Sequence, residues 1–178
     1  MYNIDEYQKQ ISQYQTVIRL QKEFILCSND IDLKQIITNI KLENENLFKW
    51  KLIMKGGRDT PYEGGLFTIS LEFPNDYPKH GPEFKFLNKI YHLNVDNQYD
   101  IGHISLSRLN EWKGTGKVRE MPIYTVKQAL FDIFWLFYNQ GTDSPYDEER
   151  CILYRDNPVK FNEEVKKWTQ KYAIDNES

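Results

Sequence analysis

The first apolar pattern along the chain is helical and lies between residues 5 and 28. Apolar side chains recur there at helical intervals, at Tyr7, Ile11, Tyr14, Ile18 and Ile25. This spacing places them in one stripe along a helix, and Ser28-Asn29-Asp30 supplies the turn that ends it. Two interpretations follow. Either the stripe packs on the protein's own sheet, or the part before Arg19 projects and binds a partner.

Beyond residue 35 the pattern changes to short apolar runs separated by turn residues. Strands are predicted over residues 36–42, 47–54, 66–73 and 83–87. Short strands joined by brief polar turns are typical of an antiparallel meander. Because proline cannot donate a hydrogen bond within a sheet, we expect the last connection to be irregular, as it contains Pro74, Pro78 and Pro82.

Helical periodicity returns after residue 124. Thr125 is a suitable N-cap for a helix that runs to about Tyr138. Further helices are predicted over residues 147–155 and 158–173, the latter with Pro158 in its first turn. A helix, a meander sheet and then helices predict an α+β fold. A chain of 178 residues is most simply one domain.

Charge and apolar content exclude several kinds of partner. Lys and Arg number 23 and Asp and Glu number 26, a net charge of −3, which does not favour broad attraction to nucleic acid or anionic lipid. The most apolar run, residues 129–138, is about half the roughly 20 residues of a membrane span. The N-terminus lacks the basic character of a presequence, and Cys27 and Cys151 suit a reducing compartment. We therefore expect a cytoplasmic protein without a cofactor or a metal.

The candidate chemistry lies between Tyr91 and Trp112. His92 and Asn94 precede a polar loop, and Ser105 follows it between apolar neighbours. An amide NH₂ such as that of Asn94 can stabilise an oxyanion during acyl transfer. A serine hydroxyl is a poor nucleophile unless a base activates it, whereas a thiol is partly ionised near neutral pH. The central question is therefore whether Ser105 can react.

Several ordered motifs resemble the core of the ubiquitin-conjugating enzymes. They are Pro61-Tyr62-Glu63-Gly64-Gly65, Phe73-Pro74-x-x-Tyr77-Pro78, Tyr91-His92-Leu93-Asn94, Gly102-x-Ile104-Ser105-Leu106 and Trp112. The resemblance covers residues 17–173, which leaves an N-terminal helical extension at 1–16 and a tail at 174–178. It implies an N-terminal helix, a four-stranded antiparallel meander and C-terminal helices.

The resemblance also implies roles for individual residues. Active members of the family carry ubiquitin as a thioester on a cysteine, and Ser105 stands at that position. Asn94 matches the residue that stabilises the oxyanion, and His92 matches the one that braces the loop. Ser144 aligns with an aspartate that tunes the incoming lysine. The loop before Ser105 is longer than in typical members, and an ångström of misplacement costs about 100-fold in rate.

These departures favour a catalytically inactive variant that acts as a binding or scaffold subunit of a protein assembly. The alternative is an active enzyme that transfers ubiquitin to lysine and whose catalytic cysteine is here replaced by Ser105. In either case the expected partners are other proteins, such as ubiquitin, a conjugating enzyme or a large assembly. Candidate contacts are the helix stripe and three basic side chains (Tyr7, Ile11, Tyr14, Ile18, Lys79, Lys117 and Arg119). The solvent face of the meander is a further candidate.

Other kinds of site fit less well. A serine hydrolase could use His92, His103 and Asp100 near Ser105, but the chain lacks a Gly-x-Ser-x-Gly elbow. A metal site built from the three histidines, His80 included, lacks ligand spacing. The basic segment 113–122 superficially resembles a phosphate loop but lacks its full spacing.

Overall fold

The computed structural model describes residues 4–114, 124–142 and 145–174. Its centre is one antiparallel sheet with the strand order β1-β2-β3-β4. The strands are β1 (Ile37–Glu43), β2 (Asn46–Lys55), β3 (Leu66–Glu72) and β4 (Glu83–Phe86). Each predicted strand is confirmed to within one residue at either end, and the α+β meander is the observed fold.

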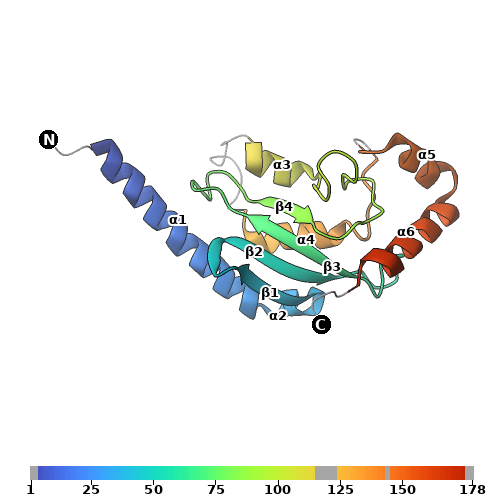
Figure 1. Ribbon diagram of the computed structural model, residues 1–178, viewed down its shortest axis with the longest axis horizontal. Helices are drawn as coiled ribbons and strands as arrows, with labels where there is room; N and C mark the ends of the chain where they lie inside the picture. The colour runs from blue at the N-terminus through green and yellow to red at the C-terminus, as the bar shows by residue number, and fades with distance from the viewer. Residues whose placement is uncertain (1–3, 115–123, 143–144, 175–178) are drawn as a thin grey trace.

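Helices surround this sheet (Figure 1). They are α1 (Ile4–Asn29), α2 (Ile31–Ile36), α3 (Ser107–Gly114), α4 (Val126–Trp135), α5 (Glu148–Asp156) and α6 (Pro158–Tyr172). Four of them match the predicted helices, whereas α2 and α3 were not predicted. The residues expected to form only a turn also start α2, because the Asp30 carboxylate accepts hydrogen bonds from the backbone N–H groups of Asp32 and Leu33.

The two faces of the sheet differ as the alternation predicts. Its inner side chains are buried, among them Trp50, Leu52, Met54, Phe67, Ile69 and Leu71. Helix α4 adds fully buried apolar residues to the same core, and the ring of Phe137 just beyond it lies 5.0 Å from that of Phe67. On the outer face Lys49 forms an ion pair with Glu72 across the β2–β3 register. The meander thus leaves a polar outer face.

Helix α1 packs through a different face from the one that its apolar stripe would suggest. Tyr7, Ile11, Tyr14, Ile18 and Ile25 are all at least half exposed, so the interpretation in which they pack on the sheet is wrong. The buried side chains are instead Thr16, Leu20, Glu23 and Cys27. Polar residues on this face are buried because they bond to partners inside the domain. A pattern of apolar residues alone cannot predict the burial of polar ones. Figure 1 shows the N-terminal part of α1 extending beyond the sheet.

Helix α4 begins as predicted and ends earlier. Thr125 caps it, and a capping box with Gln128 satisfies the first turn. Beyond Trp135 the backbone N–H groups of Leu136, Phe137 and Tyr138 bond to the third residue before them instead of the fourth. The chain therefore tightens into a short turn before Tyr138. None of the described helices has the length and apolarity that crossing a bilayer requires.

Candidate functional site

The segment that contains Ser105 folds back on the segment that contains Asn94. The backbone N–H of Ser105 donates to the carbonyl of Asn94 at 2.8 Å, and Val95 forms a β-bridge with Ile104. Gly102 anchors this return to the sheet, since its carbonyl accepts from the N–H of Phe86 at 2.8 Å. The tertiary structure thus brings together the residues that the sequence singled out on either side of the loop.

The loop between these segments is organised around Asp96. This carboxylate is only 4% exposed and accepts hydrogen bonds from the backbone N–H groups of Gln98, Tyr99 and Asp100 at 2.7–3.1 Å. Burial alone would raise the pKa of Asp96, but these donors hold it below its ordinary value. The sequence did not identify this role, although an aspartate followed by polar residues is a familiar turn signal.

His92 is buried and joins the loop to the end of α4. Its Nε2 lies 2.9 Å from the carbonyl oxygen of Leu136, and its Nδ1 accepts the backbone N–H of Asn94 at 2.9 Å. Because one ring nitrogen accepts and the other donates, the imidazole is neutral. Burial lowers the pKa of His92 to about 4. Both nitrogens are occupied, so this ring cannot act as a base toward Ser105.

The side chain of Asn94 clamps the loop after α4. Its Oδ1 accepts the N–H of Gly141 at 2.7 Å, and its Nδ2 donates to the Gly141 carbonyl at 3.2 Å. A side chain at position 141 would begin 2.7 Å from Nδ2, so only glycine allows this approach. Since an amide NH₂ carries two hydrogens, this contact leaves one for another acceptor.

Ser105 is partly buried, and its side chain meets Tyr146. Partial burial raises the pKa of Tyr146, and a hydrogen bond with Ser105 partly opposes that rise. The backbone N–H of Tyr146 donates to the carbonyl of Leu93 at 3.0 Å, which fixes the tyrosine beside the loop. Tyr146 was missed by the sequence analysis, because nothing local in the chain connects it to Ser105.

Other predicted site residues lie elsewhere. Lys79 is exposed in the β3–β4 connection. Ser144, Lys117 and Arg119 lie outside the described residues, as does most of the segment 113–122. Within the described ranges, the structure therefore brings His92, Asn94, Ser105 and Tyr146 together at the candidate site.

The three histidines do not form a metal site. His80 pairs with Asp76 at 2.6 Å, and His92 is enclosed at the end of α4. In the described part of the chain, Glu83, Asp100 and His103 bring possible ligand atoms within 4.8 Å of one another. The ammonium of Lys85 lies 2.8 Å from Asp100, however, and already supplies a cation there. This cluster is an ion-pair network at the surface.

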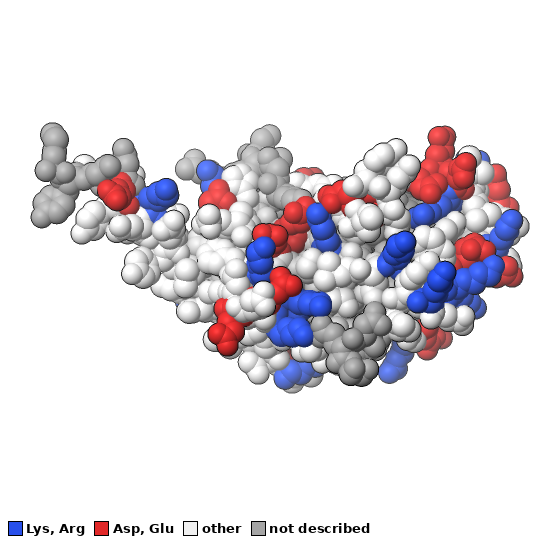
Figure 2. All heavy atoms as spheres, viewed as in Figure 1, with Lys and Arg blue, Asp and Glu red and all other residues white. Residues whose placement is uncertain are grey.

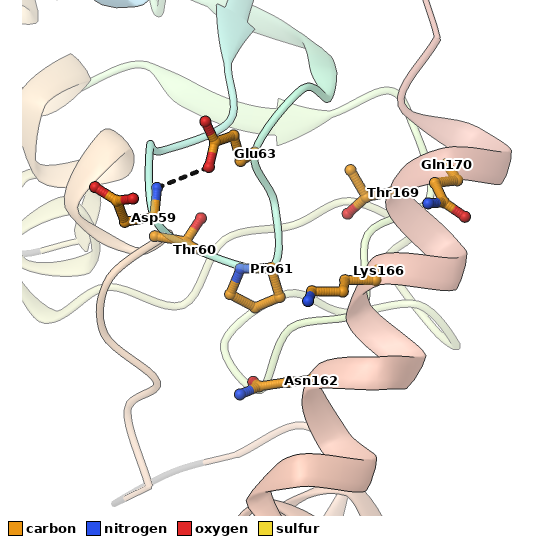
Figure 3. Close-up of a pocket in the computed structure, with 8 residues that line it drawn as sticks. All are labelled: Asp59, Thr60, Pro61, Glu63, Asn162, Lys166, Thr169 and Gln170. Carbon is orange, nitrogen blue, oxygen red and sulfur yellow. Dashed lines mark hydrogen bonds between the residues drawn. The ribbon is translucent and has the colours of Figure 1, made fainter.

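A hollow of about 630 Å³ lies between the β2–β3 connection and α6 (Figure 3). Its walls are polar, with Asp59 and Glu63 on one side and Asn162 and Lys166 on the other. The backbone N–H of Asp59 donates to Glu63 at 2.9 Å. None of its lining residues belongs to the Ser105 site, so the hollow does not serve the candidate chemistry.

The buried His92 makes a prediction about acid stability. Below pH 6.5, the ordinary pKa of histidine, an unfolded chain binds a proton that the folded ring takes up only near pH 4. The free energy of unfolding should therefore decrease as the pH drops from 7 to 4, and this residue should account for about 3 kcal/mol of the decrease. Urea unfolding at a series of pH values measures this loss.

The His92 prediction has a matched control. His92→Gln should lower stability at pH 7 and remove this part of the pH dependence, whereas His80→Gln should leave it in place because His80 is partly exposed. Parallel pH profiles for the wild-type protein and His92→Gln would contradict the assignment.

The family described as ubiquitin-conjugating enzyme matches residues 19–169. The chain is 36% identical to a protein described as a ubiquitin conjugating enzyme from Plasmodium yoelii, with a TM-score of 0.76 over 89% of this chain and 96% of that one. It is 30% identical to a Toxoplasma gondii ubiquitin conjugating enzyme E2 domain, with a TM-score of 0.71 over 88% and 98% of the two chains.

Proposed function

Because this chain belongs to the ubiquitin-conjugating enzyme family, we propose that it is a catalytically inactive member that serves as a binding or scaffold subunit of a cytoplasmic protein assembly. The observation that carries the proposal is the serine at position 105, whose hydroxyl shares a hydrogen bond with the phenol of Tyr146. A hydroxyl in that setting does not supply the nucleophile that thioester chemistry requires.

The surrounding groups support the same conclusion. A base must reach the hydroxyl proton directly or through one water. Both ring nitrogens of His92 are already bonded to Leu136 and Asn94, and Tyr146 stays protonated near neutral pH because burial raises its pKa, so its phenol is not available as a base. Asn94 retains a donor that suits an oxyanion, but its other contacts serve the loop. The site keeps its framework without an activated nucleophile.

The scaffold role assigns binding to surfaces outside this site. Residues 1–16 form the extension, 17–173 the body and 174–178 the tail in this proposal. The front half of α1 offers Tyr7, Ile11, Tyr14 and Ile18, all exposed. Exposed Lys79 and the basic residues Lys117 and Arg119 would add contacts to a protein partner, as would the polar outer face of the sheet. Ubiquitin, a conjugating enzyme and a larger assembly are the partner classes.

An active enzyme is the second candidate, and the preserved framework favours it. Asn94 and His92 still bind Gly141 and Leu136, so a cysteine at position 105 would enter a formed loop. In that case its thiolate would accept ubiquitin from an activating enzyme as a thioester. A lysine amine would then attack the thioester carbonyl, form an amide and release the thiolate.

A charging assay separates the two candidates. With activating enzyme, ATP and ubiquitin, we expect no covalent ubiquitin adduct on the wild-type protein. Ser105→Cys should discharge ubiquitin to lysine at least about 100-fold more slowly than a conventional family member, because small misplacements of reacting groups cost that much. Adducts are read on non-reducing gels, and discharge is followed after adding free lysine.

Ser107→Cys is the matched control, since this exposed residue begins α3 two positions beyond the site. It should show no more charging than the wild-type protein. Charging and discharge of Ser105→Cys at the rate of a conventional enzyme would overturn the proposal and support the active alternative.

A further inference from the structure

Helix α1 has two opposite faces, of which the domain uses only one. Thr16 and Glu23 on the inner face bond to the carbonyl of Tyr77 and to the N–H of Val126. The outer face carries large apolar side chains with no such cover. Their exposed fractions lie between 50% and 72%, and they are Ile4, Tyr7, Ile11, Tyr14, Ile18 and Ile25.

The spacing of the outer residues is that of a coiled coil. They follow one another at alternating intervals of three and four residues, with Gln21 in the position between Ile18 and Ile25. This is a heptad pattern in which every first position is isoleucine and the four fourth positions are Tyr7, Tyr14, Gln21 and Ser28. An average repeat of 3.5 residues keeps one seam facing a second helix, and β-branched residues at the first position favour two strands.

The domain does not obstruct this seam. In the same heptad frame the buried residues Thr16, Leu20, Glu23 and Cys27 occupy the third and sixth positions. At 100° per residue these positions lie on the far side of a helix from the first and fourth. A second helix can therefore lie along the seam from Ile4 to Ile18, where the described seam residues are exposed.

The flanks of the seam fit an identical helix. The positions beside it carry Gln8, Gln10, Gln15 and Val17, with Lys22 as the one charged residue among the flanks between residues 8 and 22. In a parallel pair Lys22 meets Val17 of the other copy, so no like charges face each other. Figure 2 shows the projecting part of α1 mostly without charged side chains. Opposite charges at several of these positions would select a different partner, and the flanks between residues 8 and 22 carry only the charge of Lys22.

The projecting part of α1 also lacks support from its own domain. Every side chain described between Ile4 and Gln15 is exposed. An isolated helix of about 12 residues is marginal in water, and helices in proteins are held mainly by packing. Burial of the outer face against a second helix would supply that packing.

We propose that two copies of this chain pair through the outer faces of α1 as a parallel, in-register, two-stranded coiled coil. The parallel arrangement places Gln21 against Gln21 of the other copy, where polar groups can bond to each other instead of facing isoleucine. The pairing names the partner of the first surface proposed above and does not depend on the chemistry at Ser105. If the protein proves monomeric while Ser105 proves inert, the pairing is wrong but the proposed function stands.

Light scattering after gel filtration of the full chain tests the pairing. The wild-type protein should have twice the mass of the chain, and the double variant Ile11→Glu and Tyr14→Glu should weaken the dimer at least about 100-fold, because four apolar side chains lose their burial. Gln13→Glu adds a charge on an exposed position away from the seam and should leave the dimer intact. A monomer at every concentration, or equal weakening by Gln13→Glu, overturns the proposal.

Disulfide trapping tests the register independently. In a parallel pair the two copies of residue 14 face each other within the Cα separation that a disulfide requires, about 4.4–6.8 Å. Under mild oxidation Tyr14→Cys should form a covalent dimer, and Gln13→Cys should not. Equal trapping of both variants, or of neither, would overturn the parallel arrangement.

Discussion

Replacing Glu23 with alanine is expected to lower the free energy of unfolding by about 3–5 kcal/mol, the cost of breaking a buried charge pair. Glu23 is 4% exposed and joins three parts of the fold. Its Oε1 accepts from Tyr77 at 2.5 Å and from Arg19 at 2.7 Å, and its Oε2 accepts from the backbone N–H of Val126 at 2.8 Å. Alanine would leave all three donors without this acceptor.

The Glu23 network explains why a charged residue lies inside α1. It ties the helix to the β3–β4 connection through Tyr77 and to the first turn of α4 through Val126. A buried donor without a partner costs about 1–3 kcal/mol, so the loss spreads over several groups. Burial, with Glu23 beside it, raises the pKa of Tyr77, which keeps its hydroxyl a donor.

Urea unfolding of Glu23→Ala measures this effect. Glu6→Ala is the matched control, because Glu6 is exposed on the projecting part of the same helix, and surface changes usually stay within about 0.5 kcal/mol. Glu23→Gln should fall between the two, since its amide oxygen can still accept. A loss below about 1 kcal/mol for Glu23→Ala would contradict the role of the network.

Gly102→Ala is the second change with a large expected effect, a loss of about 4 kcal/mol from overpacking and backbone strain together. Gly102 has a φ of +84°, and a Cβ there would lie 1.9 Å from the carbonyl oxygen of Phe86. The same glycine accepts from the N–H of Phe86 at 2.8 Å. Alanine must therefore push the Ser105 segment away from β4.

Gly64→Ala isolates the clash from the backbone strain. Gly64 has a similar φ of +81°, but nothing lies within 4 Å of a Cβ there. At this position only the strain of the left-handed backbone conformation should lower the free energy of unfolding, by about 1–2 kcal/mol. Urea unfolding compares the two variants, and hydrogen exchange of the Ser105 amide reports the displaced segment. Equal losses at positions 64 and 102 would mean that the close approach to Phe86 contributes nothing.

The local patterns of the sequence were enough for most of the fold. Alternating apolar residues in β2 and β3, such as Trp50 and Ile69, predicted the strands and their inner face, because burial on one side of a pleated sheet demands a period of two. Thr125 predicted the start of α4 through its own capping chemistry. Helix α3 was not predicted, because this short helix contains too few apolar residues to show a helical period.

The candidate site was predictable only in part. His92, Asn94 and Ser105 were recognised because ordered motifs surround them, and the serine at position 105 can be read directly from the chain. Tyr146 and Gly141 were not recognised. Each meets the loop only after the chain has passed through α4 and returned. Contacts between residues so distant in sequence leave no local period or motif.

The sequence by itself determined the kinds of element, their order and the oxygen at position 105, because these depend on the identity and spacing of neighbouring residues. Only the tertiary structure decided which face of α1 is buried and which groups surround Ser105. Thr16 and Glu23 lie inside because Tyr77 and Val126 offer partners there, and a polar group is buried where its hydrogen bonds are satisfied. The apolar stripe of α1 was consequently left outside.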